Sequence, residues 1–217
     1  HKGWYYSNCS YVCSLLRPEI ARDLELPRHG LQVVPFGGGA TFMRNGDHLG
    51  NYHDHDRHYR EMARHSKRDA NAYERYTADV TKQTRLIRPF LMRTPPDPTS
   101  MKPRDLSDLL DFAKAFLNMG EAGLADTIAF WTKSVGDYLG EYFETDVIKA
   151  HMAGSGIIGT ALGVYSTGTA YVLLHHYMGD VDGNVGSWGF ARGGMGAVAD
   201  AIAKAFKSYG GEIICDA

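Results

Sequence analysis

Apolar residues recur at three- and four-residue spacing through much of residues 66–152, and this pattern constrains the fold more than any other feature. Ser66-Lys67-Arg68-Asp69 resembles a capping box, with Asp in place of the usual Glu or Gln, and marks the start of the first long helix. The proline-rich run 94–98 separates that helix from the next. We expect helices over 66–87, 105–119, 121–133, 134–144 and 146–152.

The two ends of the sequence add extended segments. Asn45-Gly46, a strong hairpin signal, lies between segments that read as strands. Residues 168–178 are apolar on nearly every side and predict a buried helix. The remaining expected elements are a short helix over 17–26, strands over 31–36, 40–44, 48–52 and 187–191, a helix over 194–209 and a final strand. The fold class is therefore α+β, mainly helical, with a small and largely antiparallel sheet.

Composition excludes several classes of protein. The 217 residues are 44% hydrophobic and 22% charged, which is ordinary globular usage and argues against a disordered or fibrous chain. The formal net charge of -2 argues against a nucleic-acid binder. No apolar stretch approaches the ~18 residues of a spanning helix, so we expect no transmembrane segment. Three cysteines suit a reducing compartment, the cytoplasm or an organellar matrix.

Both ends of the chain indicate a fragment. His1 is followed at once by aromatic, structured-looking sequence, and the residues from Ile213 to Ala217 read as a strand that has just begun. We therefore expect an internal piece of a longer protein. Surfaces that its missing segments would cover should be exposed, apolar and able to form a homo-oligomer.

Residues 154–159 match the dinucleotide fingerprint G-x-G-x-x-G, and Asp180 lies at a suitable distance for a ribose contact. The fingerprint should follow a strand, however, whereas the residues before Gly154 read as a helix. The alternative is a turn in which glycine permits close helix packing.

Histidine and aspartate alternate over 53–58, as His53, Asp54, His55, Asp56 and His58. Imidazole and carboxylate groups suit zinc or iron. Neighbouring side chains on a loop or strand point apart, so the more economical interpretation is a solvated strand-to-helix junction capped by Asp54 or Asp56. A metal site stays as the alternative.

Three further groups have both structural and functional interpretations. His175 and His176 lie in the most apolar expected helix, where a structural role is the simpler one. Aromatic residues over 130–143 either form core or line an apolar ligand cavity, and these are Phe130, Trp131, Tyr138, Tyr142 and Phe143. In 188–196 a strand leads through glycines into a helix, and Arg192 is either exposed or paired with an anion.

Several blocks resemble the phytoene-dehydrogenase-related FAD oxidoreductases, in particular the branch named for a pyridine-nucleotide-disulphide oxidoreductase domain. The resemblance covers nearly the whole chain. Its most specific block is 166–196, where Gly186-Ser187-Trp188-Gly189-Phe190 precedes Arg192-Gly193-Gly194-Met195-Gly196. Supporting segments are 7–12, 15–20, 24–31 and 66–70.

The resemblance implies a substrate domain inserted into a split Rossmann-type FAD domain. The whole chain, 1–217, would be that domain: residues 1–65 would be rich in sheet, residues 66–165 helical, and residues 166–217 would lead back to the FAD domain. FAD would be bound only in the full-length protein, because this chain lacks the family's phosphate-binding glycines. The remainder of the FAD domain would then be a partner.

By the same resemblance, an apolar substrate would contact the strand before the glycine turn and the end of the preceding helix. The implied substrate residues are Ser187, Trp188, Phe190, Arg192, His175, His176 and Tyr177. Gly193, Gly194 and Gly196 would let the backbone approach the flavin. The expected reaction is hydride transfer from a C–C or C–N bond to flavin, and no catalytic residue is implied. The alternatives are a non-catalytic module for a ligand or partner, and a metal-dependent enzyme using 53–58.

Overall fold

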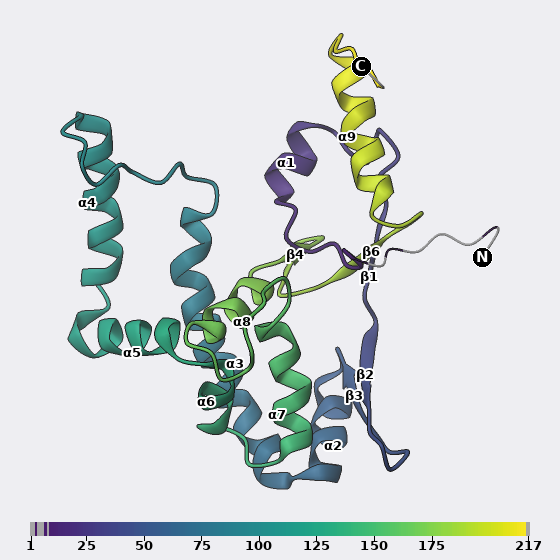
Figure 1. The fold of residues 1–217 in the computed structure, drawn as a ribbon, viewed down its shortest axis with the longest axis vertical. Coiled ribbons are helices and arrows are strands. Elements are labelled where there is room, and N and C mark those ends of the chain that lie inside the picture. Colours follow the sequence, from purple (N-terminus) through teal and green to yellow (C-terminus); the bar gives the residue numbers. More distant parts are fainter. Residues whose placement is uncertain (1–2, 4–6, 8, 216–217) are drawn as a thin grey trace. The chain divides into compact units, whose positions relative to one another are not determined.

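A computed structural model describes residues 3, 7 and 9–215 (Figure 1). These residues belong to two compact units: one formed by residues 39–175, and one in which residues 1–38 join residues 176–217. The first is the helical unit and the second the mixed unit. The assignment of the whole chain to one substrate-binding domain stays a prediction.

The helical unit confirms the expected helices, although the helix predicted over 134–144 is shorter. Strands β2 and β3 pair through the predicted Asn45-Gly46 turn. The bounds are β2 Gly38–Phe42, β3 His48–Tyr52, α2 His55–His65, α3 Lys67–Ile87, the 3-10 turn η1 Arg88–Phe90, α4 Pro103–Leu117, α5 Gly120–Thr132, α6 Val135–Gly140, α7 Asp146–Ala153, the 3-10 turn η2 Gly154–Gly156, and α8 Thr169–Tyr177.

Side-chain caps fix where these helices begin. The Asp54 carboxylate accepts a hydrogen bond of 2.7 Å from the backbone N–H of Arg57 at the start of α2, which confirms the predicted strand-to-helix junction. The Ser66 hydroxyl accepts one of 3.1 Å from the N–H of Asp69 at the start of α3. These bonds satisfy amides that a helix leaves unpaired at its first turn.

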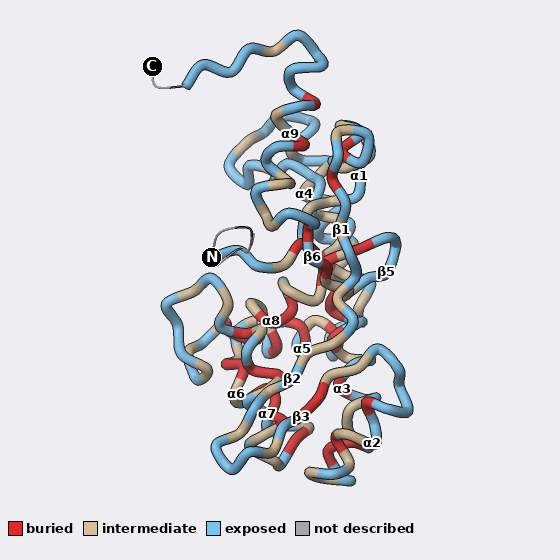
Figure 2. Tube along the Cα trace, turned by 90° about the vertical axis from the view of Figure 1, so that its right-hand side faces the viewer, coloured by how far each residue is buried: buried red, intermediate tan, exposed pale blue. Residues whose placement is uncertain are grey.

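The core of the helical unit is aromatic at its centre. Tyr76 is 1% exposed, and its ring contacts those of Tyr138, Tyr142 and Phe143. Figure 2 shows buried segments along α3, α6 and α7 and in β3. Removing one such side chain from water contributes on the order of 1.5–3 kcal/mol, so this cluster is a principal source of stability.

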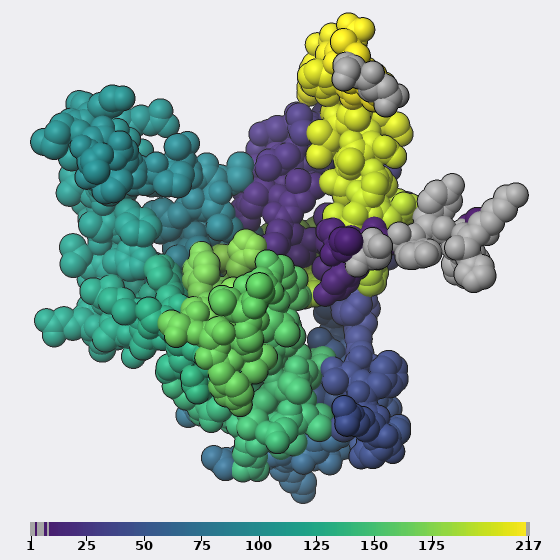
Figure 3. Space-filling view, viewed as in Figure 1, coloured from purple at the N-terminus to yellow at the C-terminus, as the bar shows by residue number. Residues whose placement is uncertain are grey.

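The mixed unit holds α1 Pro18–Asp23, β1 Val33–Pro35, β4 Asp180–Val181, β5 Asn184–Val185, β6 Gly189–Ala191 and α9 Gly196–Ser208. Its core joins Ala201 and Ala205 of α9 to Leu26, Leu31 and Ala191. In Figure 3 the yellow α9 lies against the purple N-terminal segment that includes α1. The small alanines let the helix approach this segment closely.

Strand pairing in the mixed unit differs from the expectation. The predicted strand 31–36 does not join the hairpin that follows it, because β1 pairs antiparallel with β6, with Val34 opposite Phe190. A second hairpin, β4–β5, was not predicted. Its turn residues Asp182 and Gly183 have φ of 52° and 82°, the left-handed values of a tight hairpin turn.

Two further expectations were wrong. The predicted final strand is absent among the described residues up to 215: Ile213 and Ile214 are exposed and have no strand to pair with there. The helix α8 is buried only on one face, because Leu173 and Leu174 are enclosed whereas His175 is exposed. Within the described stretches of the chain, no helix is both long and apolar enough to cross a membrane.

Candidate functional site

The segment that carries the family resemblance lies on a three-stranded arrangement in the mixed unit. Gly189 of β6 lies opposite Pro35 of β1 and, on its other edge, exchanges two backbone hydrogen bonds with Cys13, at 2.7 and 3.0 Å. A Cβ on Gly189 would lie 2.5 Å from Cγ1 of Val33 and 2.9 Å from the carbonyl oxygen of Val34. The close approach of three backbones therefore requires glycine here.

Trp188 and Phe190 have different environments on this segment. The indole Nε1 of Trp188 donates a hydrogen bond of 3.0 Å to the carbonyl oxygen of His176, and the two rings lie 6.2 Å apart. Phe190 is 44% exposed, and its ring packs edge-on against Phe36 at 5.4 Å. The mixed unit thus offers an aromatic surface on a hydrogen-bonded scaffold.

The glycine turn follows directly. Gly193 and Gly194 have φ of 89° and 83°, and Gly194 donates a backbone hydrogen bond of 2.9 Å to Ala191. Their conformation is explained by the turn that joins β6 to α9. Arg192 is exposed; its backbone N–H bonds to Gln32, and its side chain forms no ion pair within the described chain. Gly196 begins α9, with open space around its α-carbon.

The other predicted substrate residues are only partly brought together. His176 meets Trp188, and Ser187 donates a backbone hydrogen bond of 3.2 Å to Asn184 at the end of the β4–β5 turn. Tyr177 is half-buried, and its carbonyl oxygen lies 3.7 Å from where a Cβ on Gly186 would be. His175 belongs to the helical unit.

A cavity of about 460 Å³ lies in the mixed unit. It is enclosed mainly by the segment from Cys13 to Val33 and by the β4–β5 turn. None of the predicted substrate residues lines it. Its lining residues are Cys13, Leu16, Pro18, Ala21, Pro27, Leu31, Gln32, Val33, Asp180, Val181, Asp182 and Gly183.

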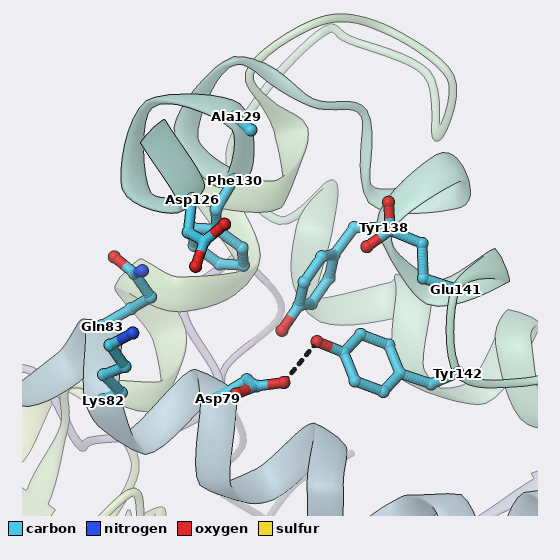
Figure 4. Close-up of a pocket in the computed structure, with 9 residues that line it drawn as sticks. All are labelled: Asp79, Lys82, Gln83, Asp126, Ala129, Phe130, Tyr138, Glu141 and Tyr142. Carbon is cyan, nitrogen blue, oxygen red and sulfur yellow. Dashed lines mark hydrogen bonds between the residues drawn. The ribbon is translucent and has the colours of Figure 1, made fainter. Parts of the chain in front are cut away.

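A smaller pocket, of about 240 Å³, lies in the helical unit where α3, α5 and α6 meet (Figure 4). Three of the aromatic residues singled out over 130–143, Phe130, Tyr138 and Tyr142, line it, whereas Phe143 belongs to the core. Apart from Ala129 the rest of the lining is polar, so the cavity is not the apolar one that the sequence left open as an alternative to core. Its other residues are Asp79, Lys82, Gln83, Asp126, Ala129 and Glu141.

Sequence reasoning missed the polar half of this pocket. Asp79 and Gln83 are four residues apart on α3, and Tyr138 and Tyr142 are four apart across the end of α6. Residues four apart share a helix face, so each pair was visible in the sequence. Only the tertiary structure shows that these two helix faces meet.

The residues 154–159 do not form a dinucleotide site. Gly154 follows α7 directly and begins the turn η2, so no strand precedes the glycines. A Cβ on Gly156 would lie 2.8 Å from Cβ of Val135 at the start of α6. The alternative interpretation is therefore confirmed: Gly156 permits close helix packing, and the strand that should precede a dinucleotide fingerprint is not there.

The histidine–aspartate cluster over 53–58 is dispersed. Asp54 caps α2, the His55 ring lies near Asp56 and Glu74, and the buried His58 ring packs on Tyr73 at 4.7 Å. Among the described residues, no group of three or more histidine, cysteine or acidic side chains is placed to hold a metal ion. Cys9, Cys13 and Cys215 are free thiols.

The chain is similar in sequence to two known proteins that have the same name. The chain is 33% identical, over 99% of its length, to the mouse protein named pyridine nucleotide-disulfide oxidoreductase domain-containing protein 2. It is 32% identical, over the same share, to the rat protein of that name. It spans only 39% of the length of each relative. No family model matches the chain.

Proposed function

We propose that this chain is the substrate-binding portion of an FAD-dependent oxidoreductase. The observation that carries the proposal is the alignment with two relatives over 99% of the chain, since the name of these relatives describes an oxidoreductase domain. Because the chain corresponds to 39% of each relative, the activity belongs to a longer polypeptide of which this sequence would be one segment.

The flavin would be held outside this chain. The residues 154–159 do not fit a pyrophosphate, because Gly156 packs against Val135. In the phytoene-dehydrogenase-related flavoproteins that the sequence resembles, FAD accepts the hydride and the protein supplies orientation and electrostatics. We propose that Gly193, Gly194 and Gly196 lie where the chain returns toward the FAD domain.

In this proposal the substrate is apolar and contacts the β6 segment. Phe190 supports the assignment because it is 44% exposed yet fixed by the β1–β6 ladder and by the ring of Phe36. Trp188 is held in place by its hydrogen bond to His176. Arg192 would supply the polar anchor, because it is an exposed basic residue two positions after Phe190.

The partner of the mixed unit would be the remainder of the FAD domain. Exposed large apolar residues support this, since such side chains suit a surface that another segment covers. They lie on the N-terminal segment, on α9 and after it. They are Tyr11, Leu15, Val34, Ile202, Phe206, Ile213 and Ile214.

The test is to express the natural polypeptide that contains this sequence together with its flanking regions. The proposal expects a yellow protein with the visible absorption bands of oxidised flavin, which an apolar amine or polyene substrate bleaches without oxygen. Phe190→Ala should slow bleaching, whereas Phe42→Ala, at a still more exposed aromatic in β2, should not. A polypeptide that binds no FAD would contradict the proposal.

A further inference from the structure

The pocket of Figure 4 has aromatic walls. The rings of Phe130 and Tyr138 meet edge-on at 4.6 Å and 82°, and those of Tyr138 and Tyr142 at 5.2 Å and 65°. The face of an aromatic ring attracts a cation, and the Tyr142 ring already has the guanidinium of Arg75 4.9 Å from its centre, so Phe130 and Tyr138 remain for a ligand. The walls therefore suit a ligand with an apolar body and a positive charge.

The pocket also carries excess negative charge. Asp79, Asp126 and Glu141 line it, against Lys82. Glu141 is neutralised by an ion pair with Lys133. Asp79 accepts a hydrogen bond of 2.7 Å from the hydroxyl of Tyr142, and within the described chain neither Asp79 nor Asp126 forms an ion pair. These two carboxylates are available to a cationic ligand.

A buried acceptor in the same pocket has no donor. Gln83 is 5% exposed, and its Nε2 donates a hydrogen bond of 3.1 Å to Oγ1 of Thr127, whose hydroxyl in turn donates to Sδ of Met119. Its Oε1 has no hydrogen-bond partner among the described residues. Buried polar groups are normally paired, so this oxygen indicates a missing ligand with a donor.

We propose that this pocket binds a small primary amine in its ammonium form. The ammonium group offers three N–H donors and a positive charge, which match Gln83 Oε1 and the carboxylates of Asp79 and Asp126. The alkyl stem would lie along Phe130 and Tyr138. A pocket of about 240 Å³ is smaller than the roughly 300–1,000 Å³ of drug-sized ligand sites, so the amine has few carbons.

This site is distinct from the proposed flavoenzyme function, because every residue that lines it belongs to the helical unit. Its chemistry also discriminates among ligands. A quaternary ammonium has the charge but no N–H for Gln83. An alcohol of the same length has a donor but no charge, and a carboxylate of that length is repelled by Asp79 and Asp126.

The test is calorimetric titration of the 217-residue chain with n-butylammonium, tetramethylammonium, n-butanol and butyrate. The proposal expects one n-butylammonium per chain, with tetramethylammonium at least about tenfold weaker, which corresponds to losing hydrogen bonds to a charged group. Butanol and butyrate should not bind measurably. No saturable binding of n-butylammonium, or equal binding of tetramethylammonium or butanol, would overturn the proposal.

Charge-neutralising variants locate the site. Asp79→Asn keeps the shape of the side chain and an oxygen that can accept a hydrogen bond from Tyr142. It should weaken the binding of n-butylammonium by about tenfold or more. Asp126→Asn should weaken this binding as well. Because Asp126 is exposed, the substitution should not disturb folding, and it therefore tests the site even if Asp79→Asn unfolds the chain. Asp200→Asn on α9 makes the same change in net charge at a residue of the mixed unit that does not line the pocket, and this variant should bind n-butylammonium as the parent does. Unchanged affinity in Asp126→Asn and in folded Asp79→Asn would contradict the assignment.

Discussion

Asp69 at the start of α3 and Glu144 before α7 are joined by a hydrogen bond of 2.9 Å, from the backbone N–H of Glu144 to Oδ1 of Asp69, although 75 residues separate them. The second carboxylate oxygen accepts from the N–H of Thr145, also at 2.9 Å. Asp69 is fully enclosed, with 0% exposure. One side chain therefore ties the first turn of α3 to the segment that leads into α7.

Replacing Asp69 should be among the most destabilising single changes in the helical unit. Asp69→Ala leaves the amides of Glu144 and Thr145 without acceptors in a buried position, and we expect a loss of about 3 kcal/mol in the free energy of unfolding. Urea denaturation followed by circular dichroism measures this loss. Asp200→Ala, at an exposed position on α9, should change stability by less than about 0.5 kcal/mol. Equal midpoints for the two variants would show that the link contributes nothing.

Stability should fall in mild acid because of two histidines. Burial lowers the pKa of His58, with further lowering from the nearby His151 and His55, and burial also lowers the pKa of His151. The unfolded chain binds protons at about pH 6.5 and the folded chain only at lower pH. The contribution of the two neutral histidines to the free energy of unfolding is therefore complete above about pH 6.5. It is lost as the pH falls toward their pKa values in the folded chain.

The variant His58→Phe tests this assignment. It keeps an aromatic ring against Tyr73 and removes the titrating group, so the melting temperature should fall less between pH about 7.5 and about 5.5 than in the parent. His55→Gln, at an exposed ring, should retain most of the parent's pH dependence. If His58→Phe and the parent lose the same stability over this range, His58 is not responsible.

Gly189 should not tolerate a side chain. Gly189→Ala places a methyl group 2.5 Å from Cγ1 of Val33 and 2.9 Å from a backbone oxygen, so β1 and β6 must separate. We expect a cost of about 1–3 kcal/mol, the usual range for overpacking. Gly37→Ala is the matched control, because nothing lies within 4 Å of the position that its methyl group would occupy and its φ is not left-handed. Thermal melting of both variants gives the comparison, and equal melting temperatures would refute the close three-strand approach.

Local sequence signals predicted the helices well and the strand pairing poorly. The helix α3 was predictable because Ser66 caps it and proline residues follow it. The β1–β6 ladder joins residues far apart in sequence, and no periodicity specifies such a partner. The β4–β5 hairpin did carry a signal, since Asp182-Gly183 is a favoured two-residue turn.

The site was predictable only in pieces. The sequence placed Trp188 and Phe190 on a strand before a glycine turn; in the structure β6 holds Phe190, and Trp188 directly precedes it. That Trp188 hydrogen-bonds to the end of α8 depends on the chain folding back through β4 and β5, which no local pattern encodes. In the helical unit, the aromatic walls of the pocket were visible as a stripe, whereas its carboxylates come from different helices.

We propose that this sequence belongs to a flavoenzyme, and one measurement tests this proposal most directly. The natural polypeptide containing this chain is purified, denatured and examined for released flavin by absorption and fluorescence. The account predicts FAD close to one per polypeptide, and none from the 217-residue chain alone, because residues 154–159 form no dinucleotide site. A folded full-length polypeptide that releases no flavin and takes up none from solution would contradict it.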